Sequence, residues 1–116
     1  MDLREQYEHI REGRDIRQNL ISIKEELKAQ EGRRELQKLY QEEPRILLEQ
    51  LEHEDPKVRK NAALILGSLG VEDSREAILL AYRKEEKRFV KSAYPEALQN
   101  FDCSDCLFEL QNRRQE

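Results

Sequence analysis

Residues 53–70 read HEDPKVRKNAALILGSLG, an apolar-rich stretch in a chain of 116 residues of which 40% are charged. Asp55 and Pro56 predict a helix start, because aspartate caps helices and proline fits the first helical position. Gly70 predicts the helix end, in the left-handed conformation that glycine adopts easily. The apolar residues between these ends lie on more than one face, so neighbouring elements must cover the helix on more than one side. Gly67 costs about 1 kcal/mol of helix propensity relative to alanine, and we expect it to allow a close packing contact.

The composition of the chain indicates one domain with a thin core. Only 37% of the residues are apolar and 6% are aromatic, which favours an elongated molecule. The 21 basic and 25 acidic residues are interleaved and leave a net charge of −4, so the chain as a whole has no strong attraction for nucleic acid or membrane. The sequence contains no signal-peptide core, and no apolar run approaches the roughly 20 residues of a membrane span. We therefore expect a cytoplasmic protein with reduced thiols.

Helical periodicity continues on the N-terminal side of the quoted stretch. Apolar residues recur there every three or four positions, whereas strand and hairpin patterns are nearly absent. The periodic positions are Leu3, Tyr7 and Ile10; Ile16, Leu20, Ile23 and Leu27; and Leu36, Leu39, Tyr40, Leu47, Leu48 and Leu51. Gly13 and Gly32 are predicted helix ends, Asp15 is a predicted cap, and Pro44 either starts a new helix or kinks a longer one. The sequence thus predicts an all-α fold, although its second periodic segment also fits a short coiled coil.

A shift of the sequence by 32 residues superimposes two helical hairpins. A hairpin repeated at such a period is typical of a solenoid, because one unit cannot bury its own apolar faces and must stack on its neighbours. Pro95 lies inside the second helix of the later unit and is expected to kink it. The shift brings together 46–48 with 78–80, Val58 with Val90, Arg59 with Lys91, Leu66 with Leu98, and Leu69 with Phe101.

The segment 47–70 resembles a HEAT-like repeat of the type found in phycobilisome-lyase-related proteins. The positions that carry this resemblance are Asp55, Pro56, Val58, Arg59, Ala62, Ala63, Leu66, Gly67 and Leu69. The resemblance implies an α-solenoid in which an acid six residues before each arginine contributes to a ladder of ion pairs. His53 stands at the acid position of the first repeat and Glu85 at that of the second. We therefore expect this ladder to be incomplete.

These patterns predict an α-solenoid within one continuous domain. We expect a helical N-terminal cap at 1–42, two HEAT-like repeats at 43–101 and the start of a third repeat at 102–116. The third unit lacks its second helix, whereas terminal repeats normally present a polar outer face. The chain is therefore expected to be the N-terminal part of a longer protein, or to have its end covered by a partner or by another copy of itself.

Cys103 and Cys106 form a C-x-x-C pair at the start of the third unit. A thioredoxin-like motif requires flanking strands, and a zinc site requires four ligands. His9 and His53 are the only histidines and are distant in sequence, while carboxylate pairs such as Glu85-Glu86 lie in polar runs. We therefore expect no metal site, no cofactor and no catalytic centre.

Basic residues concentrate around the turns of both repeats. Stacking would place them on one edge of the solenoid, where they can contact a protein partner or the phosphates of a nucleic acid. The candidate contact residues are Lys57, Arg59, Lys60, Arg83, Lys84, Lys87, Arg88 and Lys91.

The resemblance to HEAT-like repeats implies a non-catalytic scaffold or adaptor that binds a protein partner. Stacked repeats present an extended surface for such binding, formed largely by their second helices. Two alternatives remain. The chain can be an auxiliary N-terminal module of a larger enzyme, such as a SAM-dependent RNA methyltransferase, or it can bind nucleic acid through the basic edge.

Overall fold

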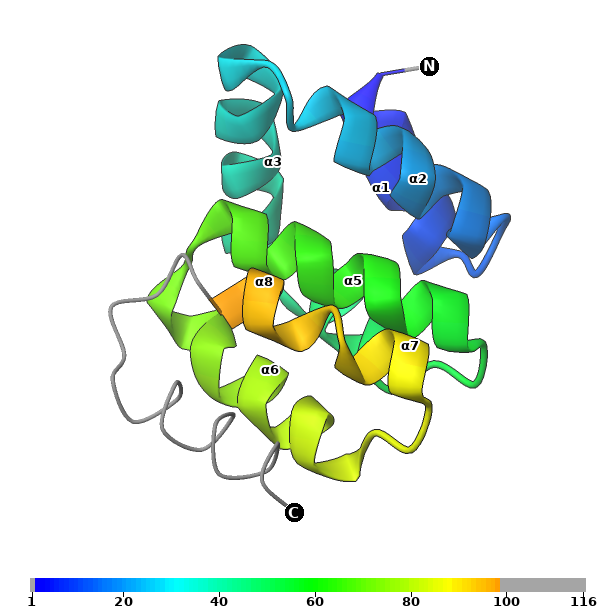
Figure 1. The fold of residues 1–116 in the computed structure, drawn as a ribbon. Coiled ribbons are helices and arrows are strands. Elements are labelled where there is room, and N and C mark those ends of the chain that lie inside the picture. Colours follow the sequence, from blue (N-terminus) through cyan, green and yellow to red (C-terminus); the bar gives the residue numbers. More distant parts are fainter. Residues whose placement is uncertain (1, 99–116) are drawn as a thin grey trace.

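The computed structural model describes residues 2–98, which fold into stacked helical hairpins (Figure 1). The described residues contain no strand, so the predicted all-α fold is confirmed. The predicted third unit, with Cys103 and Cys106, lies outside them. The helices are α1 (Leu3–Arg11), α2 (Ile16–Glu26), α3 (Gln30–Glu42), α4 (Arg45–Gln50), α5 (Pro56–Leu69), α6 (Glu72–Lys84), α7 (Arg88–Lys91) and α8 (Tyr94–Leu98).

Helix α5 lies at the centre of the stack and corresponds to the quoted stretch. The Asp55 carboxylate accepts a hydrogen bond from the Lys57 amide at 2.9 Å, and Gly70 ends the helix in the left-handed conformation, with φ 64°. Helix α2 packs against one side of α5 and α8 against another, while α4 and α6 also contact it. The side chains of Ala62, Ala63, Ile65 and Leu66 are fully buried. The predicted burial on more than one side is therefore confirmed.

Gly67 permits the close approach of α8 to α5. A Cβ atom added at Gly67 would overlap the Ala97 backbone and lie 2.7 Å from its carbonyl carbon. Glycine is therefore required by packing at this position, where its low helix propensity would otherwise be a disadvantage. The predicted packing purpose of Gly67 is confirmed.

The N-terminal segment forms a hairpin of α1 and α2 that stacks on α5. Gly13 leaves α1 with φ 77°, as predicted. The prediction that Gly32 ends the second helix is wrong, because α2 ends at Glu26 and Gly32 lies in the first turn of α3. A side chain at Gly32 would collide with the Glu26 carbonyl, so close packing again selects glycine. The Asp15 side chain forms no capping bond; instead Asn19 donates to backbone carbonyls at the start of α2.

Helix α3 links the N-terminal hairpin to the repeats and contacts the end of α5. Pro44 separates α3 from α4, so a new helix begins there. Arg33 Nη1 donates to the Ser68 carbonyl at 3.0 Å, and Gln37 Nε2 donates to the Leu69 carbonyl at 3.4 Å. The last carbonyls of a helix have no partner within the helix, so these two side chains satisfy part of the α5 terminus.

The second helix of the later repeat is broken, as Pro95 predicts. Helix α7 ends at Lys91 and α8 begins at Tyr94. Proline has no amide hydrogen, so Pro95 cannot donate to the Lys91 carbonyl that a continuous helix would pair with it. Lys91 and Pro95 therefore mark the site of the break.

The expected elongation is present but modest, with principal extents of 43 × 28 × 21 Å. The Cα radius of gyration is 13.6 Å, close to the value of about 13 Å for a compact domain of about 100 residues. In residues 2–98 the stack comprises three hairpins.

We expect Gly67→Ala to destabilise the protein even though alanine is the better helix former. The clash with the Ala97 backbone should lower the free energy of unfolding by about 1–3 kcal/mol. Urea denaturation followed by circular dichroism measures this change. Ser68→Ala, at a half-buried position of the same helix, is the control and should change stability by less than about 0.5 kcal/mol. Higher stability of Gly67→Ala would show that no close contact exists.

Candidate interaction surface

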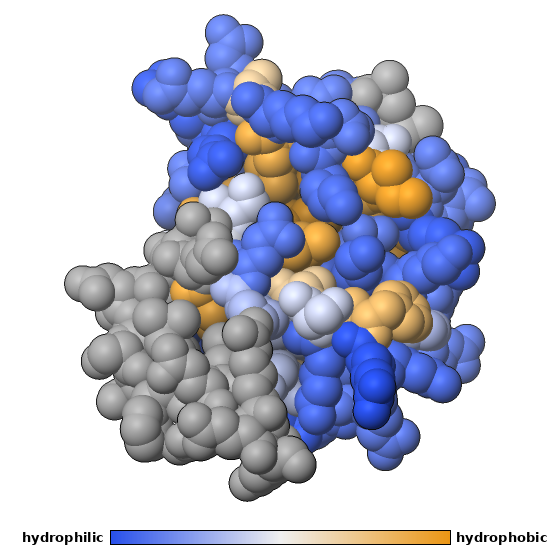
Figure 2. Space-filling model, viewed as in Figure 1, coloured by the Kyte–Doolittle hydropathy of each residue, from blue (hydrophilic) through white to orange (hydrophobic). Residues whose placement is uncertain are grey.

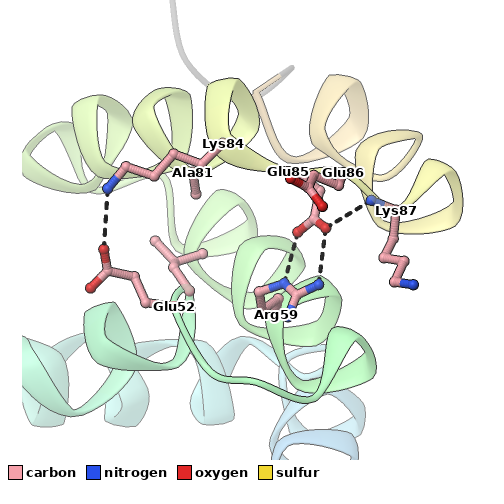
Figure 3. A pocket seen from close by; sticks show the side chains of 8 residues that line it. Glu52, Arg59, Ala81, Lys84, Glu85, Glu86 and Lys87 are labelled. Atoms are coloured by element: carbon pink, nitrogen blue, oxygen red, sulfur yellow. Dashed lines mark hydrogen bonds and ion pairs between the residues drawn. The ribbon is translucent and has the colours of Figure 1, made fainter.

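An ion pair between Arg59 and Glu85 connects the two repeats (Figure 3). Arg59 Nε donates to Glu85 Oε1 at 2.8 Å, and Nη2 donates to Oε2 at 3.0 Å. Arg59 Nη1 donates to the carbonyls of His53 and Glu54, at 2.8 and 3.1 Å. One guanidinium therefore holds both the turn before its own helix and the acid of the next repeat. Such two-bond pairs fix geometry as well as contributing energy.

The environment of Glu85 keeps its carboxylate ionised. Only 3% of the Glu85 side chain and 18% of the Arg59 side chain are exposed. Burial raises the pKa of Glu85, but the hydrogen bonds from Arg59 and from the Lys87 amide outweigh it, so this pKa lies below its ordinary value of 4.5. The sequence pattern predicted an incomplete ladder of ion pairs and placed Glu85 among polar residues. Although Glu85 stands in a polar run of the sequence, its side chain is buried and pairs with the arginine of the preceding repeat. His53 provides no carboxylate at the corresponding position of the first repeat.

A second ion pair repeats this arrangement one hairpin earlier. Arg17, at the start of α2, donates to Asp55 Oδ2 from Nε at 3.1 Å and from Nη2 at 2.8 Å. These bonds, with that from the Lys57 amide, lower the pKa of Asp55. Arg17 and Arg59 thus each pair with an acid in the next hairpin. The two acids occupy different positions in their repeats: Asp55 stands four residues before Arg59, whereas Glu85 stands six residues before Lys91.

A signal for this first pair was present in the sequence but was missed. An offset of 42 residues superimposes α2 on α5, which accounts for the position of Arg17. The superimposed pairs are Ile16 with Val58, Arg17 with Arg59, Asn19 with Asn61, Ile23 with Ile65, and Leu27 with Leu69. The offset differs from 32 because α3 lies between the two hairpins, so a search at a single period does not find it.

The predicted basic edge divides into paired and unpaired residues. Arg59 pairs with Glu85, and Lys84 lies 3.4 Å from Glu52 on the side of the first helices. Lys91 Nζ lies 5.5 Å from the centre of the Tyr82 ring, within the range of a cation–π contact. Lys60 is half-buried. The remaining predicted residues are exposed: Lys57, Arg83, Lys87 and Arg88. Of these, Arg83 interacts with another group of the chain.

Two exposed apolar side chains were also missed by sequence reasoning. Ile21 on α2 is 38% exposed and Phe89 on α7 is 45% exposed. Both line one pocket together with residues of α5. In the view of Figure 2, apolar surface lies among polar side chains over α2, α5 and α7. Ile21 follows the fully buried Leu20, and Phe89 precedes the fully buried Val90. Adjacent residues of a helix point in different directions, so neither exposed side chain lies on the buried face. In the sequence, the available signal for such an exposed side chain was an apolar residue next to a position of the periodic apolar pattern.

A pocket of about 170 Å³ lies between these two apolar side chains. Small-molecule sites typically occupy about 300–1,000 Å³, so this pocket has room for a protein side chain rather than for a typical cofactor. It is lined by Arg17, Ile21, Lys57, Lys60, Asn61 and Phe89. The structure therefore brings Lys57 and Lys60 together with residues of all three hairpins.

The histidines serve the local structure of turns and helix ends. His53 Nδ1 accepts a hydrogen bond from the Asp55 amide at 2.9 Å, and His9 Nε2 lies 3.2 Å from Arg14 Nη2. Within the described part of the chain, no group of three or more His, Cys, Asp or Glu side chains could hold a metal ion. None of the helices in residues 2–98 has the length and apolar character needed to cross a membrane.

We expect Glu85→Gln to weaken the junction between the repeats. Loss of one partner leaves Arg59 without its counter-charge, which for a largely buried pair costs roughly 3 kcal/mol. Chemical denaturation at neutral pH measures the loss. Glu86→Gln is the matched control, since Glu86 is exposed and should change stability by less than about 0.5 kcal/mol. Equal effects of the two substitutions would contradict the role given to Glu85.

We also expect acid to destabilise the protein through Glu85. Because the pKa of Glu85 is lower in the folded state, the unfolded chain takes up its proton first as the pH falls. The stabilisation is complete above about pH 5 and is lost as the pH falls through the folded-state pKa. The free energy of unfolding should therefore fall less steeply from about pH 6 to about pH 3 in Glu85→Gln than in the wild type. Parallel pH profiles would contradict this.

Comparison with known proteins agrees with the stacked hairpins. The sequence profile of a family described as HEAT repeats matches residues 44–105, more than half of the chain. Neither the curated proteins nor the solved structures contain a significant match. The matched segment contains α5, the Arg59–Glu85 pair and the broken second helix of the later repeat. The chain belongs to the HEAT repeat family.

Proposed function

We propose that the chain is a non-catalytic scaffold that binds a protein partner through the face formed by α2, α5 and α7. The observation that carries this proposal is the pair of exposed apolar side chains, Ile21 and Phe89. They come from hairpins at opposite sides of α5 and line the same pocket. Exposed apolar groups with polar surroundings are typical of protein interaction sites.

The rigidity of the stack supports this proposal. The ion pairs Arg17–Asp55 and Arg59–Glu85 connect successive hairpins, and the Gly67 contact sets the spacing between α5 and α8. A surface that is ordered before binding loses less conformational entropy when a partner binds. HEAT repeats commonly serve as interaction scaffolds. The Asp55–Pro56 pair at the start of α5 leads us to propose that these repeats are of the phycobilisome-lyase type.

The proposal can be tested by measuring which proteins the immobilised chain captures from an extract of its source organism. Ile21→Ser combined with Phe89→Ser should reduce capture of the specific partner at least about tenfold, because hot-spot apolar residues contribute 1–2 kcal/mol or more each. Quantitative mass spectrometry compares the variants, and circular dichroism checks that they fold.

Leu80→Ser is the matched control for this experiment. Leu80 is 43% exposed, close to the 45% of Phe89, but lies on α6, among the first helices. Capture should be unchanged in this variant. Unchanged capture by the Ile21 and Phe89 variant, or loss of capture in Leu80→Ser alone, would contradict the proposed face.

A further inference from the structure

The pocket between Ile21 and Phe89 has an unbalanced charge. Its lining contains three cationic side chains, two apolar ones and one amide, and no carboxylate. The cations are Arg17, Lys57 and Lys60. In a chain with a net charge of −4 this local excess is not a consequence of the overall composition.

The two lysines are not neutralised within the chain. Neither Lys57 nor Lys60 forms an ion pair with any residue that the structure describes. Asp55, at the start of the same helix, is already engaged: Oδ2 accepts from Arg17, and Oδ1 accepts from the Lys57 amide. Lys24 adds a further cation beside the pocket, with Nζ 3.4 Å from Asn61 Oδ1. The pocket therefore complements a ligand that carries negative charge.

We infer that the partner presents an acidic segment with one apolar side chain, which inserts between Ile21 and Phe89 while flanking carboxylates pair with Lys57 and Lys60. This inference rests on the proposed scaffold function and specifies its ligand. The apolar walls provide burial for the inserted side chain, and the lysines provide orientation and electrostatic attraction. The pocket volume of about 170 Å³ limits the insertion to about one side chain.

The same observations favour a peptide over single-stranded nucleic acid. Sites for single strands combine a positively charged groove with several aromatic rings on which successive bases stack. Here the pocket lining holds one aromatic ring, and an aliphatic side chain, Ile21, lies on its other side. The predicted basic edge also loses continuity, because Arg59 and Lys84 pair with acids.

Fluorescence anisotropy with synthetic probes tests the inference. The probes are a short peptide of glutamate and aspartate with one central leucine, the same peptide with central serine, and a lysine-rich peptide with central leucine. The acidic leucine peptide should bind best, and increasing salt should weaken it. Lys57→Gln with Lys60→Gln should weaken it about two- to thirtyfold, because each exposed lysine–carboxylate pair contributes modestly to affinity.

Two further variants separate the apolar and charged contributions. Ile21→Ser with Phe89→Ser should bring the leucine and serine peptides to nearly equal affinity while preserving their salt dependence. Lys84→Gln should leave binding unchanged, because Lys84 lies outside this pocket and contacts Glu52. Circular dichroism verifies that each variant folds.

Four results would overturn the inference: no binding of the acidic leucine peptide, equal binding of the lysine-rich peptide, insensitivity to Lys57→Gln with Lys60→Gln, or tighter binding of single-stranded oligouridylate at this face. If the peptides fail while capture from the extract still depends on Ile21 and Phe89, the scaffold function stands and the ligand chemistry is wrong. If capture is also independent of both residues, the proposed function fails as well.

Discussion

The need to cover α5 on two sides governs the architecture of this protein. Helix α5 is apolar over so much of its circumference that one neighbouring helix cannot bury it. Helix α2 covers one side and α8 another, with Gly67 allowing α8 to reach the α5 backbone. An isolated helix of this length would be marginal in water, so its stability comes from these packing contacts. The hairpins on either side are thus parts of one cooperative unit.

The ion pairs add orientation to this apolar packing. Burial of aliphatic side chains is non-directional and does not by itself fix how one hairpin is positioned along the next. Arg59 constrains that position, because it donates four hydrogen bonds, two to a turn and two to the acid of the following hairpin. The more exposed pair of Arg17 and Asp55 is expected to contribute less energy, since solvent screens it. Its geometry also differs, because both nitrogens of Arg17 donate to the same oxygen of Asp55, whereas Arg59 engages both oxygens of Glu85.

The sequence predicted those features that depend on residues close together in the chain. The cap at Asp55, the end at Gly70 and the break near Pro95 follow from local conformational preferences, and the 32-residue repeat follows from apolar spacing. The role of Gly32 was mistaken, since a glycine that ends a helix and one that permits close packing look alike in sequence.

The candidate surface was less predictable because it is built from three hairpins. Lys57 and Lys60 were recognised as basic residues, but nothing local shows that Ile21 and Phe89, 68 residues apart, line the same pocket. The ion pairs also depend on distant residues. Whether a lysine or arginine is available to a partner is decided by the acid that tertiary structure brings to it, as the contrast between Arg59 and Lys57 shows.

Because of the break between α7 and α8, helices of very different length support the two walls of the pocket. Ile21 stands on the eleven-residue α2, whereas Phe89 stands on the four-residue α7, whose one buried residue is Val90. Hydrogen bonds hold both ends of α7: the Lys87 amide donates to Glu85, and the Ala93 amide donates to the Val90 carbonyl. The position of Phe89 therefore depends on a helix with one buried residue, whereas that of Ile21 depends on the whole of α2.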